Sequence, residues 1–102
     1  MRPRNRRPTA PGTLLKEHYL EPREITIGQF AKATGLSRKH ISNIVNGHAA
    51  LSPETAVKFG AVLETSPELW MNAQRGVDIW DAQQSLKKWK PAAIYTGEPL
   101  ST

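Results

Sequence analysis

The 102-residue sequence predicts an all-α fold, a bundle of five helices. Apolar residues recur at helical spacing along the chain, and no clear strand is present. Four of the helical segments begin at Ser or Thr, residues that cap helix N-termini well. Two of these starts share the tripeptide Ser-Pro-Glu, in which Pro suits the first helical position and Glu complements the helix dipole.

The composition indicates one small soluble domain. Hydrophobic residues make up 38% of the chain, and the mean hydropathy is −0.51. No apolar run is long enough to span a membrane, and no apolar stretch follows the basic N-terminus as in a secretory signal. The absence of cysteine excludes disulfides and thiolate metal sites and fits a cytoplasmic protein. We divide the chain into a basic arm (residues 1–10), a helical domain (11–86) and a C-terminal tail (87–102).

The first helix follows the arm. The arm is rich in proline and arginine, so we expect it to be flexible. The helix is expected from Pro11 to Leu20, because proline suits a first helical turn and Pro22 stops the helix.

The second and third helices are joined by a short turn. Thr26 caps the second helix with Gln29 as its capping-box partner, and Gly35 supplies the positive φ that ends it. Ser37 caps the third helix, which ends at Asn46-Gly47. The apolar side chains expected to face the core are Phe30, Ala31, Leu36, Ile41, Ile44 and Val45.

Ser52 and Ser66 begin the fourth and fifth helices, and the fifth is expected to run to about Leu86. Gly60 in the fourth helix costs about 1 kcal/mol relative to alanine, and we expect it to allow close packing against another helix. The inward-facing residues of the two helices are Ala56, Phe59, Gly60, Leu63, Leu69, Trp70 and Ala73.

The fifth helix carries more apolar surface than a small core needs. Trp70 is expected to complete the core. Val77 and Trp80 are expected to lie beyond the compact bundle and to form part of a dimer interface, where aromatic residues are favoured. In the tail, Ile94 and Tyr95 are expected to form a short strand or to dock on a neighbour.

The second and third helices have the layout of a DNA-binding helix-turn-helix, in which the second helix of the motif lies in the major groove. Residues 1–48 hold nine Lys or Arg against three Glu, a charge of +6, whereas residues 49–102 hold five against six, a charge of −1. The basic half contains the motif, as binding to phosphates requires. A solvated surface helix would show a similar polar face, but the paired helices, the turn and the charge favour contact with double-stranded DNA.

Residues 35–47, GLSRKHISNIVNG, resemble the helix-turn-helix of Cro/C1-type (XRE) phage repressors. Together with residues 11–22, 51–74 and 77–83, they are similar to the HigA/VapI family of antitoxins, and the block SPELWMNAQ is the more specific part. The resemblance implies a phage-repressor-like bundle that forms a homodimer. It also implies that the chain neutralises a HigB-like, RelE-type mRNA-cleaving toxin, represses its own operon and is nucleoid-associated when bound to DNA.

The same resemblance places base contacts at the start and outer face of the third helix. Arg38 or Lys39 can donate to guanine O6 and N7, and Asn43 can pair bidentately with adenine. Each such pair discriminates between bases by about 1–3 kcal/mol. The expected base-reading residues are Ser37, Arg38, Lys39, Ser42 and Asn43, and the expected phosphate contacts are Thr26, Asn46 and His48.

Two positions depart from the family pattern. Ile27 stands where many relatives carry a DNA-contacting glutamine, and His48-Ala49 stand where many carry Lys or Arg. We therefore expect the motif itself to bind phosphate more weakly than it does in those relatives. We hypothesise that the arm compensates by reaching a minor groove or phosphates, although it could equally be a solubilising terminus. Its candidate contacts are Arg2, Arg4, Arg6 and Arg7.

The sequence does not predict an enzyme. His18, His40 and His48 are the three histidines, and none has a metal-ligand spacing with a carboxylate. No glycine-rich phosphate loop follows a strand, so no catalytic residue, metal or cofactor is expected. Two alternatives stay open: a stand-alone XRE-type repressor without a toxin partner, and a protein-interaction module that does not bind DNA.

A DNA-binding protein of this kind is expected to be a two-fold dimer on a palindromic operator. The third helices of its two protomers would then lie about 34 Å apart.

Overall fold

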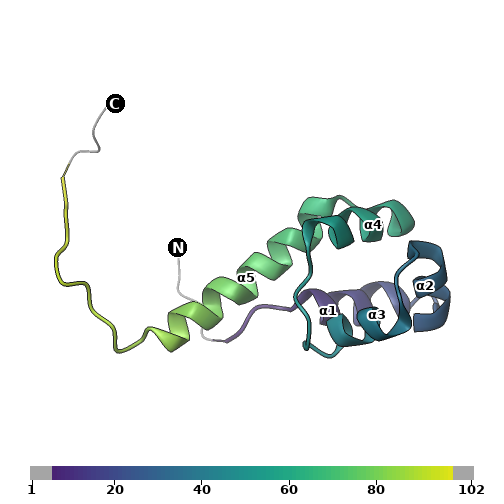
Figure 1. Ribbon diagram of the computed structural model, residues 1–102, viewed down its shortest axis with the longest axis horizontal. Coiled ribbons are helices and arrows are strands. Elements are labelled where there is room, and N and C mark those ends of the chain that lie inside the picture. The colour runs from purple at the N-terminus through teal and green to yellow at the C-terminus, as the bar shows by residue number, and fades with distance from the viewer. Residues whose placement is uncertain (1–5, 98–102) are drawn as a thin grey trace.

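The computed structural model describes residues 6–97, and within that range the chain forms helices joined by loops, with no strand. α1 continues directly into a π-helical segment, η1, so the described chain has five helices and the predicted all-α class is confirmed (Figure 1). In chain order the elements are α1 (Pro11–Leu14), η1 (Leu15–Leu20), α2 (Ile27–Thr34), α3 (Arg38–Val45), α4 (Pro53–Leu63) and α5 (Pro67–Ser85).

The expected helix caps are confirmed. Thr26 and Gln29 form a capping box: the Gln29 N–H donates to Thr26 Oγ1 at 3.0 Å, and the Thr26 N–H donates to Gln29 Oε1 at 2.8 Å. The serines before α3, α4 and α5 each accept a backbone N–H from the residue three positions on. Gly35 ends α2 with a φ of +77°. Both ends of the turn between α2 and α3 are therefore fixed by local chemistry.

The first helix keeps its predicted bounds but differs in its winding. The Glu21 N–H donates to the Lys16 carbonyl oxygen at 2.9 Å, which is the five-residue step of a π-helix. In an α-helix, positions five apart lie about 140° apart around the axis. The wider π turn brings them closer together, and both Leu15 and Leu20 are buried. Tertiary packing thus stabilises a winding that the sequence pattern does not indicate.

The centre of the core is aromatic. Phe59 packs edge-on against Phe30 and Trp70, with ring centroids 5.0 and 5.3 Å apart. Trp70 is fully buried, as expected, and its Nε1–H donates to Thr65 Oγ1 at 2.7 Å. Gly60 does allow a close approach, but mainly to the loop after α4 and not to another helix as expected, because a Cβ there would lie 2.5 Å from the carbonyl oxygen of Thr65.

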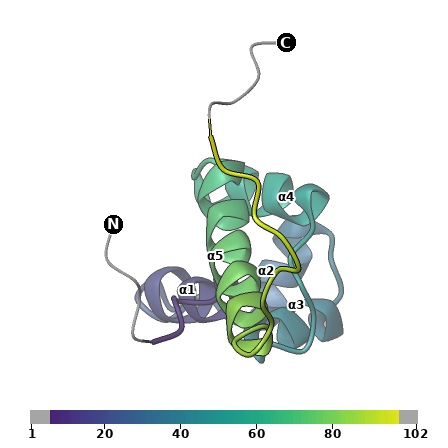
Figure 2. The ribbon, with the colours of Figure 1, turned by 90° about the vertical axis from the view of Figure 1, so that its left-hand side faces the viewer.

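α5 begins against α4 and α1 and then extends away from the bundle (Figure 1). The tail leaves its far end on the opposite side of α5 from residues 6–10 (Figure 2). Ile94 and Tyr95 are 73% and 96% exposed and lie in irregular chain, so the short strand is not formed there. No helix in residues 6–97 combines the length and the apolar character needed to cross a membrane.

Candidate nucleic-acid interface

The inner face of α3 fixes this helix to the bundle. Ile41 and Ile44 are 0% and 2% exposed, and Val45 is partly buried against the same core. α1 crosses α3 at Gly12, so closely that a Cβ there would overlap the Ile44 carbonyl oxygen and lie 2.8 Å from Val45 Cα. Only glycine permits this approach. Because the inner face of α3 packs on the bundle, its outer face is exposed to solvent.

The residues predicted to read bases share that outer face. Ser37, Arg38 and Lys39 are exposed, whereas Ser42 and Asn43 are partly exposed. Neither α2 nor α3 contains an acidic residue, so the cations on this face have no carboxylate neighbour within the motif. The structure therefore places the five residues at the start and on the outer face of α3, and their reading of bases stays a prediction.

The residues predicted to contact phosphate lie at the two ends of the motif. Thr26 is exposed at the start of α2, and Asn46 and His48 are exposed just after α3. Asn46 Nδ2 donates to Ser42 Oγ at 3.3 Å, and the His48 N–H donates to the Asn43 carbonyl oxygen at 2.7 Å. The end of α3 is thus tied to the loop that follows it.

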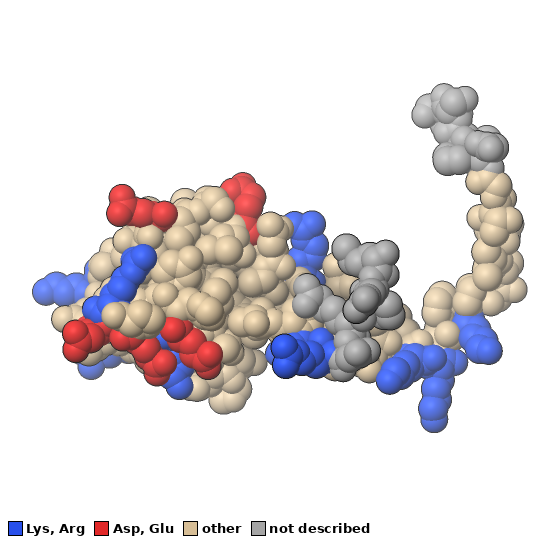
Figure 3. All heavy atoms as spheres, turned by 180° about the vertical axis from the view of Figure 1, so that it is seen from behind, with Lys and Arg blue, Asp and Glu red and all other residues tan. Residues whose placement is uncertain are grey.

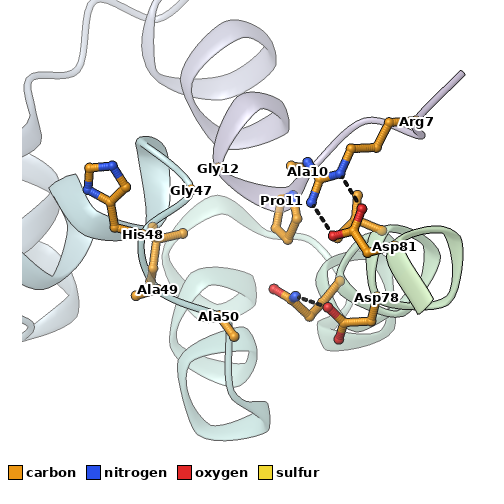
Figure 4. Close-up of a pocket in the computed structure, with 13 residues that line it drawn as sticks. Arg7, Ala10, Pro11, Gly12, Gly47, His48, Ala49, Ala50, Asp78 and Asp81 are labelled. Atoms are coloured by element: carbon orange, nitrogen blue, oxygen red, sulfur yellow. Dashed lines mark hydrogen bonds and ion pairs between the residues drawn. The ribbon is translucent and has the colours of Figure 1, made fainter. Parts of the chain in front are cut away.

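Gln74 of α5 holds the far end of that loop. Its Oε1 accepts the Leu51 N–H at 2.8 Å, and its Nε2 donates to Asp78 Oδ1 at 2.9 Å. The loop, α1 and α5 line an open pocket of about 250 Å³ (Figure 4). Sequence reasoning missed Gln74 and Gly12 as residues that position α3. A glycine inside a helix is a signal for close approach, whereas nothing in the sequence distinguishes Gln74.

Arg7 is attached to α5, which differs from the expectation of a flexible arm up to residue 10. Its Nε and Nη2 donate to the two carboxylate oxygens of Asp81, each at 2.9 Å (Figure 4). These hydrogen bonds hold the pKa of Asp81 below its ordinary value and raise the pKa of Arg7. Pro8 lies beside Gly76 of α5, at a distance where an added Cβ would make an ordinary van der Waals contact of 3.8 Å with the proline ring. Arg6 is exposed, and Arg2 and Arg4 lie outside the described residues.

Val77 and Trp80 do not share one environment. The prediction that Val77 lies beyond the compact bundle is wrong: its side chain is 3% exposed, because α1 packs against α5 at this level. Trp80 is partly exposed, and its Nε1 is shielded from solvent without an acceptor among the described residues. Ile79 and Leu86, which sequence reasoning missed, are 50% and 53% exposed.

The charged side chains are unevenly distributed over the surface. The face opposite to that of Figure 1 carries both acidic and basic groups over the bundle, whereas the charged groups seen at the far end of α5 are basic (Figure 3). Within residues 6–97, no group of three or more His, Asp or Glu side chains is arranged to hold a metal ion.

The chain is similar to known proteins along most of its length. A family model described as Helix-turn-helix matches residues 17–70. Antitoxin HigA-1 of Vibrio cholerae is 41% identical over 98 residues, which are 92% of this chain and 92% of that protein. An uncharacterised HTH-type transcriptional regulator of Haemophilus influenzae is 41% identical over 93 residues, 85% of this chain and 87% of the other.

Two solved structures are also similar to this chain over most of its length. Pseudomonas aeruginosa antitoxin HigA with the higBA promoter aligns with a TM-score of 0.76 and 28% identity, over 80% of this chain and 89% of that one. PA4674 of the same organism, in complex with its 18 bp operator DNA, aligns with a TM-score of 0.80 and 28% identity. The alignment covers 94% of this chain and 98% of that one.

Proposed function

Because this chain belongs to the HigA family of helix-turn-helix proteins, non-enzymatic DNA-binding regulators, we propose that it is the antitoxin of a toxin–antitoxin pair. In this proposal it binds and neutralises a HigB-like, RelE-type mRNA-cleaving toxin. As a homodimer it also represses its own operon by sequence-specific DNA binding, in the cytoplasm and at the nucleoid. The observation that carries the DNA-binding part is the exposed, acid-free outer face of α3 on a helix whose inner face is buried.

The chemistry of that face suits DNA. Arg38 and Lys39 at the start of α3 supply charge for phosphates or guanine, and the amide of Asn43 supplies both a donor and an acceptor for adenine. Ser37 caps the helix, so its N-terminal residues keep a defined register against a groove. A solved relative that aligns over 94% of this chain is bound to operator DNA, which supports the same use of the motif here.

The apolar surface of α5 beyond the bundle supports a homodimer. Ile79 and Leu86 lie seven residues apart, two helical turns, and each is about half exposed. Trp80, which follows Ile79 in α5, is partly exposed. A second copy of α5 would cover this surface, because a two-fold axis places the same apolar residues opposite one another. Such a dimer presents two copies of α3 to a palindromic operator.

A stand-alone repressor is the second candidate. It is favoured by the Haemophilus influenzae regulator, whose identity to this chain equals that of antitoxin HigA-1. Both candidates bind promoter DNA, and they differ in whether a toxin is bound as well.

The test is purification of the tagged protein from its native host, with mass spectrometry of the co-eluting proteins and a salt titration on its own promoter DNA. We expect a small basic protein at stoichiometric yield that arrests growth when expressed alone and is silenced by this chain. Promoter binding without such a partner would establish the stand-alone repressor. A partner without salt-dependent promoter binding would instead establish a protein-interaction module.

A further inference from the structure

Arg38, the first residue of α3, does not extend straight out from its helix. Its guanidinium lies against Gly28 in the first turn of α2. A Cβ built on Gly28 would be 2.9 Å from Nη2, 3.0 Å from Cζ and 3.1 Å from Nε of Arg38. Gly28 has no positive φ, so its backbone conformation does not require glycine. What glycine provides is space, and the guanidinium occupies the volume that a side chain would fill.

The charge of Arg38 is uncompensated within the described chain. The two ion pairs found in residues 6–97 join Arg7 to Asp81 and Lys58 to Glu54. Arg38 is exposed and has no side-chain hydrogen bond to a described residue. A guanidinium carries five N–H donors in a planar fork that matches the oxygens of a phosphate or carboxylate. The side chain is therefore placed by packing, while its donors stay available to an anion.

We propose that Arg38 binds a DNA phosphate and does not read a base, and that Gly28 positions it for that role. This inference rests on the proposed function. In a docked helix-turn-helix the first helix of the motif crosses the DNA backbone while the second enters the groove. A guanidinium packed on the first turn of α2 lies on the backbone side of the motif. Phosphate contacts fix register and orientation but carry no sequence information.

The assignment changes which residues specify the operator. Ile27 of this chain cannot donate a side-chain hydrogen bond to a phosphate, and the guanidinium of Arg38 supplies such donors one residue away, at Gly28. Base reading is then left to the side chains further along the outer face of α3, namely Lys39, Ser42 and Asn43. This differs from the sequence-based expectation, which placed Arg38 among the base-reading residues.

The test compares Arg38→Gln with the wild type on promoter DNA and on a random duplex of equal length, between 50 and 200 mM salt. Losing one phosphate contact lowers the slope of log K against log salt by about 0.9 per protomer. We expect this change, with equal fold-losses of affinity on both duplexes and an unchanged specificity ratio. Lys32→Gln, which removes an exposed cation elsewhere on α2, is the matched control and should change the slope little.

Two results would overturn the assignment. One is a loss confined to the promoter with relaxed preference at one base pair, which identifies a base-reading residue. The other is no change on either duplex. Failure of the wild type itself to prefer its promoter would count against the proposed function, and so the two failures are distinguishable.

Gly28→Ala tests the positioning role separately. Alanine favours the helix, so the variant should fold and keep its melting temperature. Its methyl group would displace the guanidinium, and we expect a reduced salt slope with the specificity ratio unchanged. The double variant Gly28→Ala/Arg38→Gln should bind no more weakly than Arg38→Gln alone, because both changes act on one contact. Additive losses would show that Gly28 acts independently of Arg38.

Discussion

Asn43 shows how a residue on the outer face of α3 can be both fixed and available. Its backbone carbonyl oxygen accepts the N–H groups of His48 and Ala49 at 2.7 and 3.1 Å, which closes the end of α3 onto the loop. Its side chain is partly exposed and makes no side-chain hydrogen bond to a described residue. The backbone therefore holds the position, while the donor and the acceptor of the side-chain amide stay without a partner in the described chain.

From this we predict that Asn43→Ala weakens binding to the operator by about 1–3 kcal/mol and relaxes specificity at one base pair. Binding to random DNA should change little, because the amide is assigned to a base and not to a phosphate. The measurement is a titration of both duplexes by fluorescence anisotropy at one salt concentration. Equal losses on the two duplexes would show that Asn43 does not read a base. The fold should be retained, since the closing hydrogen bonds use the backbone.

At the scale of elements, the sequence predicted the helices better than their packing. Capping is local chemistry, so the starts at Thr26 and at the three serines could be predicted from a few neighbouring residues. The π-helical winding of η1 and the burial of Val77 could not, because both depend on what packs against them. Similarly, the outer face of α3 follows from helical periodicity, whereas the position of Arg38 over Gly28 depends on how two helices cross.

The crossing of α1 and α3 gives a prediction about stability. Gly12→Ala should lower the free energy of unfolding by about 1–3 kcal/mol, because the added Cβ overlaps the Ile44 carbonyl oxygen and the two helices must separate. The matched control is Gly76→Ala in α5, where the nearest side-chain atoms are those of Pro8 at 3.8 Å. That change should be neutral or stabilising by up to about 1 kcal/mol. Urea denaturation measures both, and equal effects would contradict the close crossing.

The attachment of the arm to α5 gives a prediction about pH. The pKa of Asp81 is lowered in the folded chain, so the contact with Arg7 is present above the ordinary aspartate pKa of about 3.9 and is lost as pH falls through the lower folded value. Asp81→Asn should release Arg7 already at neutral pH. Nitrogen relaxation of the Arg7 side chain by NMR would detect the release, with Glu68→Gln as an exposed-acid control. An equally rigid Arg7 in Asp81→Asn would mean that packing of Pro8 holds the arm.

At the scale of the whole molecule, the bundle and the far half of α5 differ in how much apolar surface they leave exposed. The bundle buries its aromatic core and displays one basic helix face, and both features could be predicted from the sequence. The apolar residues on the far half of α5 were predicted only in part, because Val77 is covered by α1 while Ile79 and Leu86 are not. The sequence of a long helix does not show how far the other helices pack along it. That extent decides which of its apolar residues stay exposed.

We expect the dimer interface to lie on the far half of α5. Ile79→Ala should weaken self-association by about 1–2 kcal/mol. Trp80→Ala should weaken it by as much or more, because aromatic anchors dominate interfaces. Val57→Ala on α4, at a residue 56% exposed, is the matched control and should leave the dimer constant unchanged. Sedimentation equilibrium measures the constants. Operator affinity should fall together with the dimer constant, since a single α3 contacts only one half-site. Because Trp80 is partly buried in its own chain, Ile79→Ala decides the outcome: an unchanged dimer constant in that variant would place the interface away from α5.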